Sequence, residues 1–260
     1  MKSFGQFGPD PAQPYASLIA AQGRLYGTTT AGGRGGTGSV YSIDTKGKVV
    51  VVHSFGPLTS HDGQVPVASL IVVNGTVYGT TAEGGLYRRS GCQPAPCPGY
   101  GVAYSVDASG KETVLHNFGN SGDGVNPSSD LIYLKGRFYG TTKFGGRFGY
   151  GTVFSMTTSG VETVLHNFGG SGDGGVPMSR LSYVNGQLYG TTAGGGAYKT
   201  HGTVFSIALD GSNETIVHSF GASGDGSDPE AGLTYLGGKF YGMTKTGGAA
   251  NDGTVFSLTP

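Results

Sequence analysis

A five-fold internal repeat is the feature that most constrains what this chain can fold into. The segment Tyr-Gly-Thr-Thr, which becomes Tyr-Gly-Met-Thr in its last copy, recurs in steps of 52, 61, 50 and 52 residues. Its copies begin at Tyr26, Tyr78, Tyr139, Tyr189 and Tyr241. A second segment follows each copy and is clearest as Gly-Thr-Val-Phe at 202–205. Self-similarity at a period near 50 residues indicates a repeat architecture.

The third repeat shows what one unit contains. Segments rich in Val, Ile, Leu, Tyr, Phe and Thr are separated by Gly, Asp or Asn, which is typical of short strands and tight turns. The spacing predicts strands over 130–134, 137–142, 151–156 and 161–168. The first two strands are joined by only two residues, Lys135-Gly136, a length that suits a turn with positive φ angles. Four short antiparallel strands per repeat predict the blade of a β-propeller.

The two ends of the chain predict how the ring closes. Lys2–Gly5 resembles the end of a fourth strand, and 254–258 resembles a third strand with no fourth strand after it. We therefore expect an all-β, five-bladed β-propeller in which the N-terminal strand completes the last blade and removes an exposed sheet edge. The expected single domain is 1–260, with repeats at about 6–56, 57–119, 120–169, 170–221 and 222–260, the last completed by 1–5.

Composition excludes several classes of partner. Lys plus Arg and Asp plus Glu both number 16, so no basic excess indicates nucleic-acid binding. No apolar run approaches the ~20 residues that span a bilayer, and no signal peptide is recognisable, so we expect no membrane insertion. Glycine occupies 52 positions, but 13 Phe and 15 Tyr are too many for a disordered linker.

The two cysteines, Cys92 and Cys97, lie in the largest insertion, 86–100 of the second repeat. Prolines between them favour a tight loop, so we expect a local disulfide, which weakly favours an oxidising compartment. A zinc site is the less favoured alternative, because no second Cys or His pair lies at matching spacing. We expect no metal and no cofactor.

A family resemblance rests on four motifs that recur in order: Tyr-Gly-Thr-Thr, Gly-Gly, Gly-Thr-Val-Phe and Leu-His-Asn-Phe-Gly. Together they resemble the GloVer tandem repeat over essentially the whole chain. The blade plan is also similar to kelch repeats, although the kelch tryptophan is absent. The GloVer resemblance implies a secreted or surface-displayed bacterial protein, and it implies no particular reaction or catalytic residue.

Two residue types recur at fixed places in the repeats. An aspartate stands four residues before a proline in each crossover, and a histidine ends most fourth strands. We interpret both as structural: the aspartate accepts backbone N–H groups in a turn, and the histidine is a buried hydrogen-bonding fixture. Calcium contacts are the alternative for the aspartates, but one per loop is few. The residues are Asp10, Asp62, Asp123, Asp173, Asp225, His53, His116, His166 and His218.

Positions at which the repeats differ are candidates for function. First strands line a propeller channel, so Asp130, Arg180 and Glu230 are expected near its mouth on the face with long loops. A chance scatter of surface charges is the alternative. Loops on that face also carry aromatic rings, which suit sugar rings but could instead cap the blades. They are Tyr87, Tyr100, Phe144, Phe148, Tyr150 and Tyr198.

These observations lead to three functional hypotheses. The first is a non-enzymatic, lectin-like module that binds a glycan or another small polar ligand, acts as a monomer and lies outside the cell or on its surface. The second is a glycoside hydrolase or polysaccharide lyase that uses Asp130 and Glu230, with Arg180 to orient an anionic group and Asp228 in reserve. The third is a structural or adhesive surface module with no small ligand.

Overall fold

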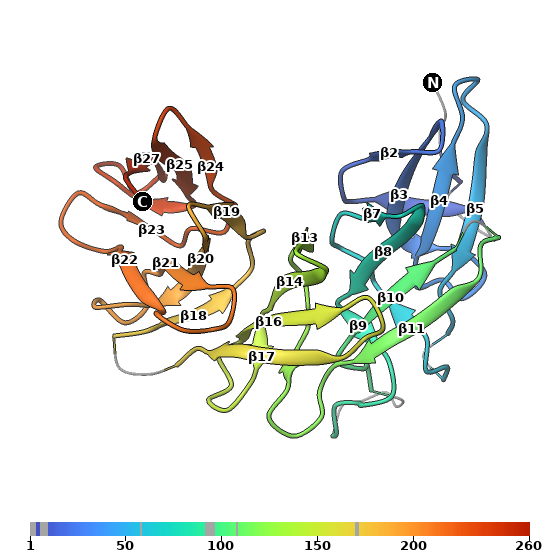
Figure 1. The fold of residues 1–260 in the computed structure, drawn as a ribbon, viewed down its shortest axis with the longest axis horizontal. Coiled ribbons are helices and arrows are strands. Elements are labelled where there is room, and N and C mark those ends of the chain that lie inside the picture. Colours follow the sequence, from blue (N-terminus) through green and yellow to red (C-terminus); the bar gives the residue numbers. More distant parts are fainter. Residues whose placement is uncertain (1–3, 6–9, 58, 92–96, 108, 170–171) are drawn as a thin grey trace. The chain divides into compact units, whose positions relative to one another are not determined.

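The computed structural model describes residues 4–5, 10–57, 59–91, 97–107, 109–169 and 172–260 (Figure 1). These residues form antiparallel strands and connecting loops, and none of them forms a helix that could span a membrane. The chain divides into two compact units, which are described separately below. The first contains Met1–Asn120, Val125–Phe138 and Met156–Glu162, and the second contains Ser121–Gly124, Tyr139–Ser155 and Thr163–Pro260.

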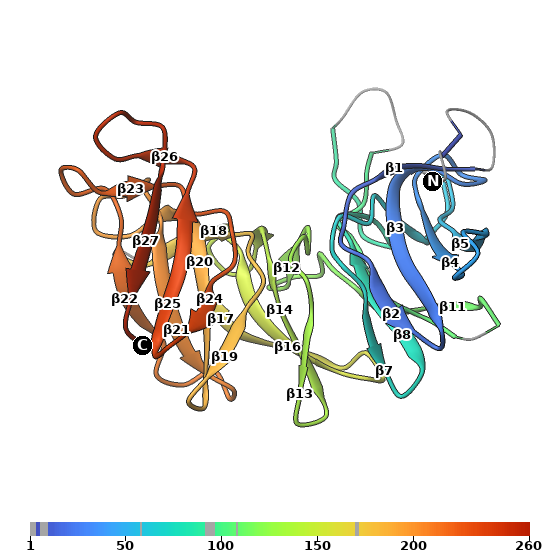
Figure 2. The ribbon, with the colours of Figure 1, turned by 90° about the horizontal axis from the view of Figure 1, so that it is seen from above.

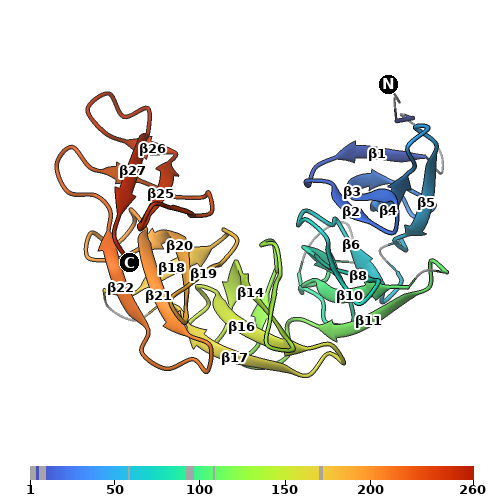
Figure 3. The same ribbon diagram turned by 45° about the horizontal axis from the view of Figure 1, so that its top comes forward.

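The first unit contains the sheets of the first two repeats (Figure 3). In the first repeat the strand order is β1-β3-β4-β5, with β2 also paired to β3. In the second repeat the order is β11-β10-β8-β7, and β6 pairs with β9. The strands are β1 Pro11–Pro14, β2 Ile19–Ala21, β3 Arg24–Gly32, β4 Ser39–Ile43, β5 Val49–Ser54, β6 Gly63–Gln64, β7 Ile71–Val73, β8 Thr76–Thr81, β9 Glu83–Gly84, β10 Val102–Val106 and β11 Glu112–Asn117.

The third repeat contributes residues to both units. Its sheet has the order β13-β14-β16-β17, and β12 pairs with β15. The four main strands agree closely with those predicted from the sequence. The strands are β12 Gly124–Val125, β13 Ile132–Leu134, β14 Arg137–Thr142, β15 Phe144–Gly145, β16 Thr152–Thr157 and β17 Glu162–Asn167.

The second unit contains the sheets of the fourth and fifth repeats (Figure 2). The fourth repeat has the order β18-β20-β21-β22, with β19 also paired to β20. The fifth has β24-β25-β27, and β23 pairs with β26. The strands are β18 Gly174–Pro177, β19 Ser182–Val184, β20 Gln187–Gly195, β21 Thr203–Ala208, β22 Thr215–Ser219, β23 Gly226–Ser227, β24 Thr234–Leu236, β25 Lys239–Thr244, β26 Thr246–Gly247 and β27 Thr254–Leu258.

The two-residue hairpin predicted for the third repeat is confirmed there and recurs in the other four repeats. All ten residues of these turns have φ between 49° and 88°, which is the requirement of the mirror-image turns that match the twist of a hairpin. The turns are Gln22-Gly23, Asn74-Gly75, Lys135-Gly136, Asn185-Gly186 and Gly237-Gly238.

The repeated Tyr-Gly-Thr-Thr segment has a physical explanation in the fourth repeat. A Cβ atom on Gly190 would lie 2.6 Å from Cζ of Phe205, so only glycine leaves room for the aromatic ring of the neighbouring strand. Two positions along, the buried hydroxyls of Thr192 and Thr203 hydrogen-bond to each other at 2.8 Å. The glycine makes room for the ring, and the threonine provides a polar link between the second and third strands.

Neighbouring sheets within a unit pack through aromatic rings. The Phe that ends a fourth strand contacts the aromatic residue of the next repeat's third strand, as in Phe55 with Tyr104 at 5.1 Å and Phe220 with Phe256 at 4.9 Å between ring centroids. A tyrosine of the repeated segment also packs between sheets: the ring centroid of Tyr189 is 4.5 Å from that of Phe240 in the next repeat.

Ring closure stays a prediction. The described part of the fifth sheet has three strands, and Lys2 and Ser3, which were predicted to pair with β27, lie outside the described residues. Phe4 packs on Tyr41 at 5.1 Å, in the way Phe55 packs on Tyr104 in the next repeat. Phe4 thus occupies the place of a fourth-strand phenylalanine preceding the first repeat.

Candidate functional site

The fourth repeat differs from the others where its crossover segment pairs with the end of its second strand. In β18 and β20, Gly175 lies opposite Gly194. The corresponding pairs elsewhere carry side chains: Ala12 with Ala31, Gln64 with Glu83, and Ser227 with Thr246. The fourth repeat therefore lacks side chains on both partners of this pair.

The backbone does not require glycine at either position. Neither Gly175 nor Gly194 has a positive φ angle. A Cβ on Gly194 would have a single neighbour within 4 Å, the carbonyl oxygen of Gly175 at 3.7 Å, and a Cβ on Gly175 would meet Tyr150 at an ordinary 3.4 Å. Since a Cβ would be tolerated at both places, the glycine pair leaves space above the strands empty.

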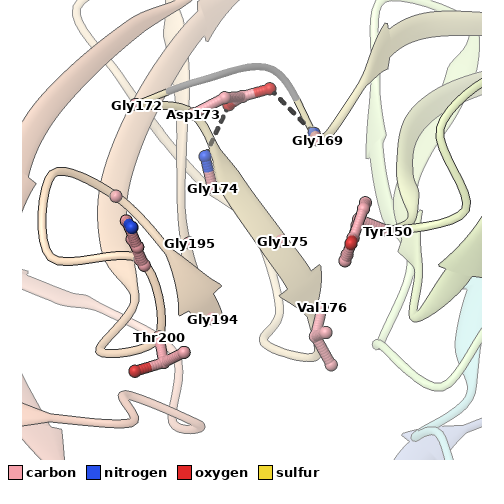
Figure 4. A pocket seen from close by; sticks show the side chains of 12 residues that line it. Tyr150, Gly169, Gly172, Asp173, Gly174, Gly175, Val176, Gly194, Gly195 and Thr200 are labelled. Atoms are coloured by element: carbon pink, nitrogen blue, oxygen red, sulfur yellow. Dashed lines mark hydrogen bonds between the residues drawn. The ribbon is translucent and has the colours of Figure 1, made fainter.

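The space is a pocket of about 380 Å³ on the long-loop side of the fourth repeat (Figure 4). Glycines form its floor, and side chains from three loops surround it. In Figure 4, Tyr150 lies on one side and Thr200 on the other, with β18 between them. The lining residues are Tyr150, Gly169, Gly172, Asp173, Gly174, Gly175, Val176, Gly194, Gly195, Gly196, Lys199 and Thr200.

Tyr150 is firmly held although its side chain is 54% exposed. Its carbonyl oxygen accepts the N–H of Val176 at 2.8 Å. Its ring packs so closely on Gly169 that a Cβ there would lie 2.6 Å from Cδ2 of the ring. The aromatic face is therefore presented to the pocket by a fixed backbone, which lowers the entropy cost of using it for binding.

The opposite wall is a short, hydrogen-bonded loop. Gly195 donates to the carbonyl oxygen of Lys199 at 3.0 Å, and Lys199 donates to that of Gly196 at 3.0 Å. Lys199 has a φ of 70°, and both Lys199 and Thr200 are exposed. This loop brings an ammonium and a hydroxyl group to the pocket rim.

Asp173 holds the turn at one end of the pocket. Its two carboxylate oxygens accept the N–H groups of Gly174 at 2.6 Å and Gly169 at 3.1 Å, as the dashed lines of Figure 4 show. Burial opposes ionisation, but the hydrogen bond and charge of His166 and these backbone donors lower the pKa of Asp173. The predicted acceptance of backbone N–H groups by the crossover aspartates is confirmed at Asp173.

The aspartates and histidines that the sequence showed separately form pairs. His Nε2 lies 3.3, 3.1 and 2.9 Å from the aspartate Oδ2 in the pairs His53–Asp62, His166–Asp173 and His218–Asp225. Each of these histidines also contacts the phenylalanine two residues later edge to face. The pairing was missed because the histidine belongs to the fourth strand and the aspartate to the crossover that follows it.

The three charged residues expected at a channel mouth have separate local environments. Asp130 Oδ1 accepts the backbone N–H of Ser69 at 2.6 Å in the first unit. In the second unit, Glu230 pairs with Lys245 at 3.0 Å and Arg180 is exposed. Because Asp130 and Glu230 belong to different units, their approach to one another stays a prediction.

The six aromatic residues predicted for the long-loop face also lie in different local environments. Tyr150 lines the pocket, and Tyr198 lies two residues from Thr200 with 47% of its side chain exposed. Phe144 and Phe148 are exposed and stack under neighbouring cations, Lys143 and Arg147.

The other two aromatics, Tyr87 and Tyr100, lie in the first unit and bond to each other through their backbones at 3.1 Å. Tyr100 also covers Gly119, as the capping interpretation expects. In the same loop Cys97 is disulfide-bonded, and its predicted partner Cys92 lies outside the described residues.

Comparisons with known proteins identify the repeat and the fold. The model of the Gloeobacter/Verrucomicrobia repeat matches residues 95–260. No curated protein sequence matches the chain. Among solved structures, the chain is similar to a luciferin-regenerating enzyme, with a TM-score of 0.53 and 12% identity over 94% of this chain and 76% of that one.

Two bacterial enzymes have comparable similarity. The quinohemoprotein alcohol dehydrogenase of Comamonas testosteroni has a TM-score of 0.55 and 13% identity over 97% of this chain and 44% of that one. A gluconolactonase of Xanthomonas campestris has a TM-score of 0.50 and 14% identity over 93% of this chain and 70% of that one. These proteins are β-propellers, and at such low identity they show the fold alone.

Proposed function

Because the chain belongs to the Gloeobacter/Verrucomicrobia repeat family, whose name states no activity, we propose its function from the geometry: it binds carbohydrate in the pocket of the fourth repeat. The observation that carries this proposal is the pairing of Gly175 with Gly194, two glycines that neither φ nor crowding requires. They leave open a volume that side chains occupy in the other described pairs.

The groups around the pocket match the chemistry of a sugar ring. The exposed face of Tyr150 suits the apolar C–H side of a pyranose. Thr200 and Lys199 can donate hydrogen bonds to ring hydroxyls, and the glycine floor lets a ligand approach backbone groups closely. With no net charge on the chain, a neutral saccharide is the favoured ligand.

Filling the pocket tests this proposal. Gly194→Val adds a β-branched side chain that a strand accepts, and Ala31→Val makes a matched change at the equivalent position of the first repeat. A glycan array identifies the best neutral oligosaccharide, and calorimetric titration then measures its affinity. We expect Gly194→Val and Tyr150→Ala to weaken binding by at least about tenfold, ~1.4 kcal/mol, and Ala31→Val to leave it unchanged.

Two results would contradict the saccharide-binding proposal. Absence of saccharide binding at millimolar concentrations by the unchanged protein would refute the proposal. Equal losses in Gly194→Val and Ala31→Val would show that valine disturbs the sheet, and would remove the pocket from the explanation. Circular dichroism and thermal melting of each variant identify any that do not fold.

An enzymatic function is the alternative, and one cluster favours it. Asp228 lies beside Glu230 in the second unit, and Lys245 Nζ is 4.0 Å from Asp228 and 3.0 Å from Glu230. Burial, together with the charge of Glu230, raises the pKa of Asp228, as an acid catalyst would need. Release of reducing ends from a polysaccharide, abolished by Glu230→Gln, would establish hydrolysis.

We also propose that the five blades form a closed ring and that the protein acts outside the cytoplasm. Tyr241, Met243 and Val255 are 41%, 57% and 78% exposed, so the last described sheet has an apolar face without a neighbour in its own unit. The disulfide at Cys97 supports an oxidising compartment. The register Val204↔His218 predicts that Val255 pairs with Lys2. A disulfide formed between Lys2→Cys and Val255→Cys in a monomer would support closure, and its failure to form would count against it.

A further inference from the structure

A glutamate joins one His–Asp pair in each unit as a third member. In the first unit Glu112, the first residue of β11, comes from the second repeat and approaches His53 and Asp62. In the second unit Glu214, just before β22, approaches His166 and Asp173 in the same way. In both clusters one nitrogen or oxygen atom of each residue lies within 4.8 Å of the other two.

Each aspartate is oriented by the backbone. Oδ1 of Asp62 accepts the N–H of Gly63 and Oδ2 accepts that of Gly56, both at 2.7 Å. Oδ2 also faces His53 Nε2 at 3.3 Å, so the backbone donors hold this oxygen beside the imidazole. Side chains of His53 and Asp62 are only 18% and 17% exposed, which makes the site partly dry and preorganised.

The glutamates are incompletely satisfied. Oε1 of Glu112 and Oε1 of Glu214 are buried and have no hydrogen-bond partner among the described residues. In each cluster one oxygen of the glutamate lies within 4.8 Å of an aspartate oxygen. Two carboxyl groups held together this way repel each other when ionised, and a cation between them would remove that cost.

We propose that each cluster binds a divalent transition-metal ion, for which Zn²⁺ is the natural probe, through the histidine Nε2 and one oxygen of each carboxylate. One imidazole and two carboxylates suit zinc or manganese, whereas calcium and magnesium prefer all-oxygen sets. Two carboxylates and a neutral histidine balance the charge of the ion. With three protein ligands, a fourth position is left for water.

The ion would act as a link between successive repeats. In the first unit it would tie β5 and the crossover to β11 of the next sheet, at His53 and Glu112. The second and third repeats carry the same residue types in the sequence, at His116, Asp123 and Glu162.

The fourth His–Asp pair provides a control within the chain. His218 and Asp225 are 2.9 Å apart, but no third ligand accompanies them among the described residues. The side chain of His218 is 42% exposed, against 18% for His53. The proposal therefore predicts that His218 contributes no site.

The test is calorimetric titration of the metal-free full chain with Zn²⁺. Glu112→Gln and Glu214→Gln keep the shape of the side chain and remove the ligand charge, so each is expected to lower the number of bound ions by about one per chain. His218→Asn should leave that number unchanged. Co²⁺ in place of Zn²⁺ should show visible absorption bands of a low-symmetry, four- or five-coordinate site, which the two glutamine variants weaken.

Two results would overturn the proposal. One is absence of Zn²⁺ binding to the unchanged chain at micromolar concentration, which would leave the clusters as hydrogen-bonded fixtures of the fold. The other is a stoichiometry that falls in His218→Asn but not in the glutamine variants, which would indicate binding to exposed histidines. Titration of the unchanged chain decides the question even if a variant fails to fold. The cluster at Glu112 has no residue in the saccharide pocket, so either proposal can fail alone.

Discussion

Replacing Glu112 by Gln in metal-free protein should change how stability depends on pH. Glu112 has a folded-state pKa of about 7 against 4.5 for the free side chain, mainly because of burial and then the charge of Asp62. The folded state therefore holds a proton that the unfolded chain has released between these two values. Stability from this group is complete below about pH 4.5 and is lost as the pH rises through 7.

The size of the effect follows from that shift. A difference of about 2.5 pKa units corresponds to at most ~3.4 kcal/mol at ~1.4 kcal/mol per unit. Glu112 is only half-buried, so screening by solvent reduces the expected effect to roughly 1–2 kcal/mol. His53, Asp62 and Tyr104 lie nearby and remain in the variant, so the difference between the two proteins isolates Glu112.

Urea unfolding in the presence of a chelator, at several pH values from about 5 to about 8, measures this difference. The free energy of unfolding of the unchanged protein should fall by roughly 1–2 kcal/mol relative to Glu112→Gln across that range. Glu83→Gln, a glutamate of β9 outside the cluster, is the matched control. Parallel curves for the unchanged protein and Glu112→Gln, or a difference that grows in the other direction, would refute the reasoning.

Three further predictions concern the fold. Gly190→Ala places a Cβ 2.6 Å from Phe205 Cζ and should lower the free energy of unfolding by about 1–3 kcal/mol in urea titrations; a change under ~0.5 kcal/mol would contradict the crowding argument. Lys135→Asn, at φ 49°, should raise the thermal midpoint slightly, since asparagine tolerates this conformation better, and a lower midpoint would contradict it. Phe220→Ala, fully buried against Phe256, should cost about 3–5 kcal/mol, whereas a small loss would show that the two sheets pack weakly.

The main strands could be predicted because each has its own local signal. Alternation of apolar residues marks strands such as 137–142, and the dipeptide Asn185-Gly186 marks a hairpin by the φ angles it tolerates. The short pairs such as β6 with β9 were missed, because two residues are too few to show a period. These short pairs form only when the crossover segment folds back onto the end of the second strand of the same repeat, which is a tertiary contact.

The metal-ligand clusters could not be predicted because they join different repeats. His53 and Glu112 are far apart in the chain, and within either repeat each looks like an ordinary strand residue. One signal was available. Glutamate stands four residues before His116, His166 and His218, but valine takes that place at Val49 before His53. Compared across repeats, that pattern would have raised the question of what the glutamate contacts.

The saccharide pocket was hidden for a different reason. With 52 glycines in the chain, Gly175 and Gly194 are inconspicuous, and most other glycines of the loops are explained by positive φ or close packing. Only the register of β18 with β20 shows that these two face each other. Tyr150 was predicted as an exposed aromatic residue. The glycine pair shows why its ring can bind a ligand, because a pocket lies beside the ring.

Repetition and variation therefore predict different stoichiometries for the two proposed sites. The glycine pair occurs in the fourth repeat alone among the pairs whose register is described, so this pocket should bind one saccharide per chain. The His–Asp–Glu set is part of the repeated framework, and two described copies should bind at least about two metal ions per chain. Binding of one saccharide and at least two metal ions per chain would support both assignments: a saccharide site that is particular to the fourth repeat, and metal sites that recur with the repeats. Equal numbers of the two ligands would mean that one of the assignments is wrong.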